Sequence, residues 1–289
     1  MGTITPKMTM KQRQAVLDKG GQIKFTSGSY NITDTLYLSS NSSVVCDKDV
    51  TFVKKCKPAM LMTRVTDKTT KFNGVHDLSW TGGNIISDVT GSTQSNIFSI
   101  VHAKNVLVQN VRFSRDRAQH CIEVNASKNV QIISCVFEDH RPYKDYKEAI
   151  QIDFANYAGL TYAAADAPTY DGTHCRDISI RKCTFSCPAT AIGTHTVSYA
   201  DKFHKGILID FCDYFGDKTG VFTRLLNMRA VTVTNNYVEK ALVAVLATTK
   251  SKEVLDHGGT VNVDNEKRCR NVIVKQNQLI DCYTDFSIV

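Results

Sequence analysis

A short phrase recurs seven times after residue 75, and this repetition constrains the fold more than any other feature. The copies read "VHDLSWTGGNI", "NVLVQNVRF", "NVQIISCVF", "DISIRKCTF", "GILIDFCDYF", "AVTVTNNYV" and "NVIVKQNQL". The shortest spacing between copies is 24 residues. This period, with apolar and polar residues alternating inside each copy, predicts stacked β-strands rather than paired helices. The first apolar anchors of the copies are Leu78, Val106, Val130, Ile178, Ile207, Val231 and Val272.

The predicted fold class is all-β, a single-stranded right-handed parallel β-helix with a short N-terminal capping helix. A leucine-rich repeat has a similar period, but its Leu-x-x-Leu-x-Leu pattern and its helix are missing from the sequence. Residues 8–19 predict an amphipathic helix that covers the first rung, whose strand edges would otherwise be open to pairing. We expect residues 1–74 to hold this cap and the first strands. Residues 75–289 are expected to form about seven clear rungs, continuous with the cap as one domain.

A second strand is predicted after the first strand in most copies, and these second strands can be aligned with one another. They cover residues 121–125, 149–153, 191–195, 220–224, 242–245 and 286–289. The alignment predicts one inward column of Ile122, Ile150, Ile192, Val221, Leu242 and Phe286. It predicts a second inward column of Val124, Ile152, Thr194, Thr223, Ala244 and Ile288. Side chains alternate between the two faces of a strand, so the residues between and beyond these columns are expected to face outward.

The predicted outward positions carry polar residues, and these form the candidate site. Neighbouring strands lie about 4.8 Å apart, so outward side chains on successive rungs touch one another. Such a concentration of ionisable groups indicates a functional site, and a solvated sheet face whose charges pair for stability is the structural alternative. Glu148 begins one of these strands beside His120 of the previous rung. The outward column is Asn125, Asp153, His195 and Arg224, with Glu123 and Gln151 beside it.

Three insertions interrupt the repeats. One runs from 154 to 174, directly after Asp153, and its Tyr157 and Tyr162 are suited to stacking on sugar rings. A smaller insertion, "EDHRPYKDYK", precedes Glu148. The first two insertions therefore flank the candidate site, whereas the third, from 248 to 269, is expected to be a plain loop.

The ten cysteines are expected to be structural and largely free. They include no CxxC pair and no zinc spacing, which predicts that they form no metal site. Cys135, Cys183 and Cys212 take the same position in three consecutive first strands, followed there by Asn236 and Asn277. Cysteines stacked in a solenoid core are expected to stay reduced, and stacked asparagines to hydrogen-bond along the turn.

Charge and hydropathy limit the partners of the chain. The net charge of +7 comes from 35 Lys and Arg that are spread along the sequence, so we interpret it as a solvated surface, with a polyanionic glycan as the functional alternative. No nucleic-acid partner is predicted. No segment is apolar over the roughly 18 residues of a membrane span, so no membrane insertion is expected. The polar start, "MGTITPKMTMKQRQ", is not typical of a signal peptide, which favours synthesis in a cytoplasm.

The N-terminal segment and the repeats resemble the pectate-lyase-like superfamily of right-handed parallel β-helices. The resemblance lies in Gly20-Gly21, in "GSYNI" and "LYLSSN", and in the repeats after residue 75, so it covers nearly the whole chain. Members include polygalacturonase-type glycosidases, polysaccharide lyases, epimerases and tailspike or tail-appendage proteins of bacteriophages. The resemblance implies an oligosaccharide or polysaccharide partner. It favours a virion-associated protein that acts at a cell surface, and it allows a homotrimer.

The motifs of the polygalacturonase type are missing, and only the order of an acid, a histidine and an arginine on successive rungs is similar. Glycoside hydrolysis needs two carboxyl groups, and Glu123 and Asp153 are expected to have backbones roughly 8 Å apart, which favours inversion. One would act as general acid and the other as base, with Glu148 in reserve. We assign His195 to orient the acid and Arg224 to anchor the substrate.

Other activities remain open at this point. The predicted binding residues are Arg224, Gln151, Asn125, His120, Tyr157 and Tyr162. A polysaccharide lyase is the second interpretation, with Arg224 and His195 acting on an anionic glycan. No cofactor is predicted, although a lyase could use Ca²⁺. A receptor-binding module that grips a glycan without cleaving it is the third interpretation, and a purely structural β-helix is the fourth.

Overall fold

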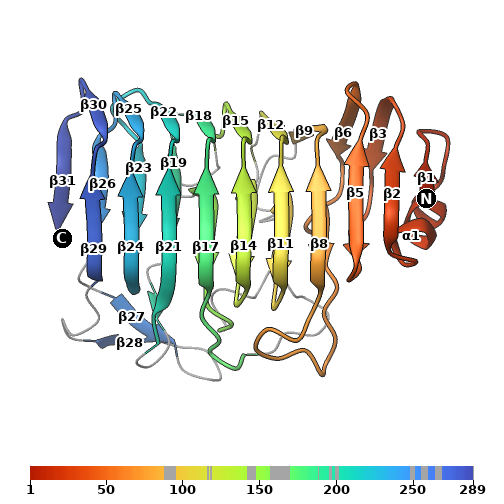
Figure 1. Cartoon of the computed structure of the whole chain (residues 1–289), viewed down its shortest axis with the longest axis horizontal. Coiled ribbons are helices and arrows are strands. Elements are labelled where there is room, and N and C mark those ends of the chain that lie inside the picture. The colour runs from red at the N-terminus through yellow and green to blue at the C-terminus, as the bar shows by residue number, and fades with distance from the viewer. Residues whose placement is uncertain are drawn as a thin grey trace.

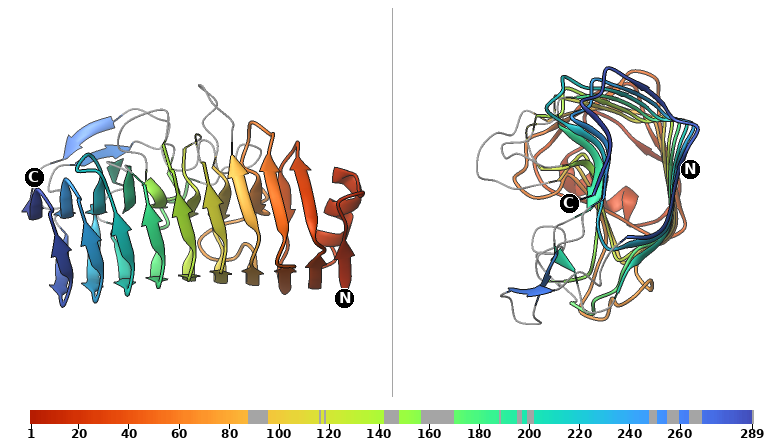
Figure 2. Two further views of the ribbon diagram at one scale, coloured as in Figure 1. Left: turned by 90° about the horizontal axis from the view of Figure 1, so that it is seen from above. Right: turned by 90° about the vertical axis from the view of Figure 1, so that its left-hand side faces the viewer.

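The chain winds into a coil whose successive turns stack along one axis. A computed structural model describes residues 1–87, 96–115, 117, 119–141, 148–156, 170–187, 189–194, 197–198, 202–247, 251–254, 260–263 and 269–288. In each regular turn the chain adds one strand to each of three parallel sheets, so residues far apart in the sequence lie side by side (Figure 1). Viewed along the axis, the three sheets form the walls of the coil (Figure 2). The predicted right-handed parallel β-helix is confirmed.

Three long sheets share a strictly parallel pairing within the described residues. Sheet 1 contains β1 (Gly2–Ile4), β2 (Gly21–Phe25), β5 (Ser42–Cys46), β8 (His76–Thr81), β11 (Lys104–Gln109), β14 (Lys128–Ile133), β17 (Arg176–Arg181), β21 (His204–Asp210), β24 (Met228–Thr234) and β29 (Arg270–Lys275). Sheet 2 contains β4 (Leu36–Leu38), β7 (Leu61–Thr63), β10 (Phe98–Val101), β13 (Ile122–Asn125), β16 (Glu148–Asp153), β19 (Thr190–Thr194), β23 (Val221–Leu225), β26 (Val243–Ala247) and β31 (Thr284–Ile288). Sheet 3 contains β3 (Gly28–Ile32), β6 (Val50–Lys54), β9 (Asn84–Ser87), β12 (Arg112–Ser114), β15 (Val136–Glu138), β18 (Thr184–Ser186), β22 (Asp213–Phe215), β25 (Tyr237–Glu239) and β30 (Gln278–Ile280).

A small fourth sheet lies beside the coil. It joins β20 (Val197–Ser198), β27 (Ser251–Val254) and β28 (Thr260–Val263), and β27 and β28 pair antiparallel. The prediction that residues 248–269 form a plain loop is therefore wrong. The prediction compared this segment only with the parallel repeat, and the sequence signals of an antiparallel hairpin differ from those of that repeat.

The predicted register of the first strands is confirmed. The anchors pair in an unbroken series across sheet 1, from Leu78 with Val106 to Val231 with Val272. The strands also begin before the first recognised repeat, because sheet 1 already starts at β1. The early turns lack the recurring phrase, so the sequence indicated fewer turns than the coil contains.

The core is a single apolar cluster inside the coil, which runs from Ile4 to Val245. Identical residues stack on neighbouring turns, and the rings of Phe113, Phe137 and Phe185 lie face to face with centroid distances of 5.0 and 4.7 Å. All ten cysteines are free, as predicted. The asparagine ladder is also confirmed, because Asn236 donates to Asn277 Oδ1 at 2.9 Å and accepts from the Cys212 backbone at 2.8 Å.

The N-terminal cap is the helix α1 (Met10–Leu17). Thr9 and Gln12 form a reciprocal capping box at its start, which fixes where the helix begins. Arg13 is buried over the end of the coil, where its guanidinium donates to the carbonyl oxygens of Asn31 at 2.9 Å and Pro6 at 3.0 Å. Its removal from water lowers the pKa of Arg13. Within the described part of the chain, no helix is long and apolar enough to cross a membrane.

Candidate functional site

The candidate site lies on the outer face of sheet 2. Ile122 and Val124 of β13 enter the core, so Glu123 and Asn125 point to the other side. The next strand repeats this arrangement, with Glu123 paired to Gln151 and Asn125 paired to Asp153. The predicted alignment of 121–125 with 149–153 is therefore confirmed. We call the outward positions in register with Glu123 the polar column, which contains Ser99, Glu123, Gln151, Gly193 and Arg224.

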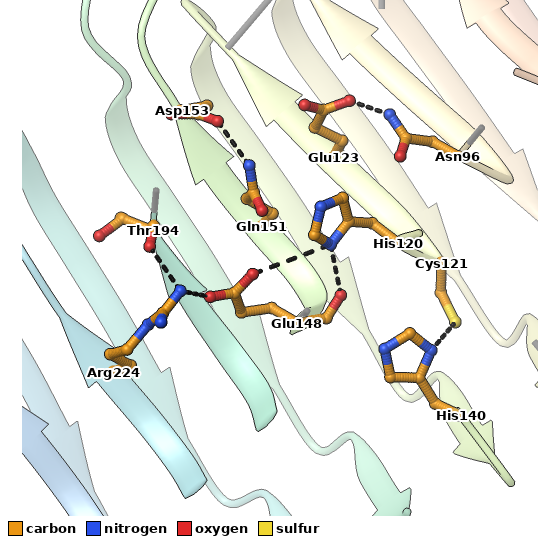
Figure 3. Close-up of polar contacts among 10 residues, drawn as sticks. All are labelled: Asn96, His120, Cys121, Glu123, His140, Glu148, Gln151, Asp153, Thr194 and Arg224. Atoms are coloured by element: carbon orange, nitrogen blue, oxygen red, sulfur yellow. Dashed lines mark hydrogen bonds and ion pairs between the residues drawn. The ribbon is translucent and has the colours of Figure 1, made fainter. Parts of the chain in front are cut away.

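The two central acids of the site are nearly closed to solvent and are held by amides. Asp153 is fully buried and Glu123 is 5% exposed. The side chain of Asn96 donates to Glu123, and that of Gln151 donates to Asp153 (Figure 3). The backbone N–H of Phe154 also donates to Asp153 Oδ1 at 3.2 Å. Each of these donors is a neutral amide rather than a cation.

A second cluster joins Glu148 to groups from two other turns. The guanidinium of Arg224 donates to Glu148 Oε1 and, at 3.0 Å, to the carbonyl oxygen of Thr194 (Figure 3). His120 Nδ1 lies 2.6 Å from the Glu148 carbonyl oxygen and 3.9 Å from its Oε2. Glu148 is 1% exposed, so its charge is stabilised by a cation rather than by water. This pairing makes Glu148 a poor proton donor, because a neighbouring cation favours the ionised carboxyl.

The predicted neighbour of Arg224 is wrong. The alignment placed Arg224 beside His195, but Arg224 pairs with Gly193 and Thr223 pairs with Ile192. Val221 was predicted opposite Ile192, and Phe222 rather than Val221 joins the core cluster. A Cβ atom at Gly193 would lie 2.8 Å from Glu148 Cγ and 3.3 Å from Arg224 Cβ. The glycine thus leaves room for the buried ion pair to form across the strand.

The predicted register of the last two strands of sheet 2 is also wrong. Val221 pairs with Val243 and Thr223 with Val245, one residue later than expected, and Val245 then pairs with Phe286. The predicted inward residue Leu242 is outside the core cluster, while Ala244 belongs to it. Phe286, also predicted inward, is 46% exposed because its strand is the last in the sheet.

Several predicted site residues lie outside the described part of the chain. These are His195, Tyr157 and Tyr162, together with most of the insertion from 154 to 174. Asn96 and Ser99 were missed, although they extend the site by one turn. Asn96 Nδ2 lies 3.2 Å from Ser99 Oγ. The tetrapeptide "FSIV" at 98–101 is repeated at 286–289, and this identity could have revealed β10 as a strand of the same sheet.

A small apolar cluster borders the same face, on turns from β4 to β16. Met62, Val101, Ala126 and Ala155 form a small buried cluster outside the coil, with further residues packed against it. Tyr37 and Tyr170 are half-buried there, and Arg64 lies 5.1 Å from the ring centroid of Tyr37. On the turns of β13 and β16, Ala126 and Ala155 follow the strands that carry Glu123 and Asp153, so apolar residues lie beside the buried carboxylates.

Two histidines lie near the corner between sheets 2 and 1. The Cys175 backbone N–H donates to His204 Nδ1 at 3.0 Å, which requires the neutral ring. Burial lowers the pKa of His204 to about 3. Burial, together with the charges of Arg176, Lys205 and Lys202, lowers the pKa of His174 to about 4. Among the described residues, no group of three or more His, Cys, Asp or Glu side chains is placed to hold a metal ion.

Comparison with solved structures identifies the fold. The chain is similar to the surface adhesin PfbA of Streptococcus pneumoniae, with a TM-score of 0.72 and 19% identity over 95% of this chain and 74% of that one. It is similar to a family 28 exopolygalacturonase of Yersinia enterocolitica, with a TM-score of 0.63 and 8% identity over 99% and 66% of the two chains. It is also similar to the tailspike of E. coli bacteriophage HK620, determined with a pentasaccharide, with a TM-score of 0.57 and 11% identity over 100% and 57%.

These likenesses show that the chain has a right-handed parallel β-helix fold. No protein-family profile matches the sequence, and no curated protein resembles it in sequence. The fold neighbours include an adhesin, a glycosidase and a phage tailspike, so the fold alone does not select one activity.

Proposed function

We propose that the protein is a carbohydrate-active β-helix that binds a bacterial surface polysaccharide or exopolysaccharide along the outer face of sheet 2 and hydrolyses it, as a phage tail module acting at the cell surface. The observation that carries this proposal is the pair of buried carboxyl groups, Glu123 and Asp153, on adjacent strands of one face. Most glycosidases require two carboxyl groups that lie close together on either side of the bond they cleave. Similarity to the exopolygalacturonase and the tailspike supports the same class of ligand.

The proposed roles follow from the surroundings of each acid. Asp153 and Glu123 serve as the general acid and the base for water, because each is held by a neutral amide that leaves it able to exchange a proton. Glu148 is held by Arg224, so it positions the guanidinium rather than transferring a proton. Arg224 and Gln151 anchor the substrate, with Asn125 and His120 completing the wall of the site. Inversion is expected from the backbone separation of about 8 Å that strand geometry gives the two acids.

The apolar cluster that borders the face supplies a stacking surface for sugar rings. Tyr37 and Tyr170 are half-buried, which leaves part of each ring for a ligand. Aromatic faces bind the C–H surface of a sugar while its hydroxyl groups reach the neighbouring polar residues.

A non-catalytic glycan-binding module is the second candidate. The deep burial of Asp153 favours it, because a fully buried carboxylate held by two donors can support the wall of a binding site without exchanging a proton with a sugar. The similarity to an adhesin also supports this candidate.

Incubation with a panel of capsular, teichoic and plant-type glycans tests the proposal. New reducing ends without the ultraviolet absorbance of unsaturated uronates are expected for a hydrolase, and both signals together would indicate a lyase. Retention of a glycan on a column without cleavage would replace hydrolysis with binding. If no glycan is cut or retained, the carbohydrate proposal is wrong.

A further inference from the structure

A continuous row of basic side chains begins the strands of sheet 1. Lys104 pairs with His76 on one side and Lys128 on the other, and the series continues turn by turn to Arg270. Seven neighbouring strands thus carry a basic residue at one position. At about 4.8 Å per turn, the row is about 29 Å long. We call it the basic column, and it contains His76, Lys104, Lys128, Arg176, Lys205, Arg229 and Arg270.

The basic column works against the stability of the sheet. Like charges on directly opposed positions of adjacent strands repel one another. In the described part of the chain, no ion pair joins Lys104, Lys128, Lys205 or Arg229 to an acid. An arrangement that breaks a local rule of stability, repeated on successive turns, is typical of a functional surface.

Neighbouring groups offset little of this charge. Asp77 and Asp177 follow the basic column by one residue, and Asp77 is engaged by His76 at 2.9 Å and by Asn105 at 2.8 Å. At the corresponding place on later turns stand Gly206, Ala230 and Asn271, which carry no charge. The positive charge therefore persists along the C-terminal half of the column.

Two contacts fix the arginines of the column without neutralising them. The guanidinium of Arg229 lies 3.7 Å from the ring centroid of Phe203. Arg176 Nε donates to His174 Nε2 at 2.9 Å. The lowered pKa of His174, caused by burial and then by the charges of this region, agrees with a positive local potential. Arg176 and Arg229 are thus held in place while keeping their charge for a ligand.

The basic column runs beside the candidate site. Asn125 ends β13 on sheet 2, and only Ala126 and Ser127 separate it from Lys128 at the start of β14. The starts of these sheet 1 strands form a row along one border of the sheet, so the column follows the axis of the coil (Figure 1). Lys104, Lys205 and Arg270 are exposed, and the other members are half-buried.

We propose that the basic column binds the acidic groups of a linear anionic polysaccharide that lies along the coil. A polymer with a charged group at regular intervals matches a row of cations at regular intervals, whereas a compact anion would meet only two or three of them. This inference rests on the proposed function and gives its substrate class as a carboxylated or phosphorylated glycan. Part of the positive charge that is spread along the sequence is thereby gathered in the basic column.

Affinity electrophoresis of the full chain tests this inference, with polygalacturonate, a teichoic acid or neutral dextran in the gel. The double variant Lys104→Gln/Lys205→Gln removes two exposed charges from the column. We expect about three- to tenfold weaker retention by an anionic glycan, the effect of two exposed ion pairs, and a weaker dependence on salt. Neutral dextran should retain the double variant and the wild type equally.

A matched control removes the same charge elsewhere. Lys11→Gln/Lys48→Gln alters two exposed lysines at the N-terminal end, outside the column, and should bind as the wild type does. Equal loss of retention in both double variants would overturn the inference. Absence of retention by either anionic glycan at low salt would also overturn it, as would tighter retention by single-stranded DNA. Asp153→Asn separates the two proposals. If Asp153→Asn loses cleavage but the column variant binds anionic glycans as the wild type does, the proposed function stands and only the role of the basic column is rejected.

Discussion

The inner and outer faces of sheet 2 differ in how closely one turn resembles the next. On the inner face, Ile122, Ile150 and Ile192 stack as the same residue on three successive strands. The outer face over the same strands passes from Glu123 to Gln151 and then to Gly193. Packing requires the repetition on the inside, because each side chain must fit the one before it. The outer face is free of that requirement, and its variation is where chemistry can be placed.

The largest expected effect on stability comes from breaking a stack of identical residues inside the coil, here the phenylalanines of sheet 3. Phe137 is fully buried between Phe113 and Phe185. Phe137→Ala should lower the free energy of unfolding by about 3 to 5 kcal/mol, through lost burial and the cavity left behind, as measured by denaturant titration. Phe215→Ala is the control, since Phe215 is 41% exposed and its loss should cost far less. Equal losses would show that the stack has no special part in stability.

An outer-face charge pair should give the next largest effect. Glu148→Gln leaves the guanidinium of Arg224 buried without its carboxylate, which should cost about 3 kcal/mol of unfolding free energy. The double variant Glu148→Gln/Arg224→Gln should recover part of this loss, because it removes the second buried charge as well. If the two single losses simply add in the double variant, Glu148 and Arg224 do not interact in solution.

The two histidines near the corner between sheets 2 and 1, His174 and His204, should make stability depend on pH. The pKa values of His204, about 3, and His174, about 4, lie below the ordinary value of about 6.5, so the unfolded chain binds protons first as the pH falls. Stability should be complete above about pH 6.5 and decline steadily toward pH 4. His204→Gln should flatten that decline in melting experiments. A variant with the same slope as the wild type would show that His204 is not kept neutral by folding.

The smallest effect is expected at the basic column. Lys128→Gln should raise the melting temperature by about 1 °C at low salt, because it relieves repulsion from Lys104 and Arg176. The gain should vanish at high salt, where the repulsion is screened. Lys48→Gln, an exposed lysine elsewhere, should show no such gain. A lower melting temperature for Lys128→Gln would contradict the repulsion.

The contrast between the faces also explains which predictions from sequence succeeded. The anchors from Leu78 to Val272 aligned correctly because repeated inner packing leaves a repeated pattern. The error at Arg224 is a shift of two residues, which leaves Thr223 and Arg224 on their predicted faces and is therefore invisible to alternation at these positions. The error at 242–245 is a shift of one, and "LVAV" is apolar at every position, so it gave no sign of which face each residue takes.

The candidate site was predictable in part. Glu123, Gln151 and Asp153 were found together because their strands differ by a whole turn of the repeat. The partnership of Glu148 with Arg224 could not be read from the sequence, since it depends on the space that Gly193 leaves across the strand. Asn96 was missed because it precedes β10, and the alignment of second strands began one turn later, at residues 121–125.

The most direct test of the account is Asp153→Asn, assayed for cleavage, glycan retention and melting temperature in the same preparation. Asparagine keeps an oxygen for the Phe154 N–H but cannot exchange a proton as a carboxyl group does. Proton transfer by a placed carboxyl supplies about 10²- to 10⁴-fold in rate, so turnover should fall by about that factor while retention and melting temperature change little. Unchanged turnover and unchanged retention, with a large drop in melting temperature, would instead show that Asp153 only supports the fold.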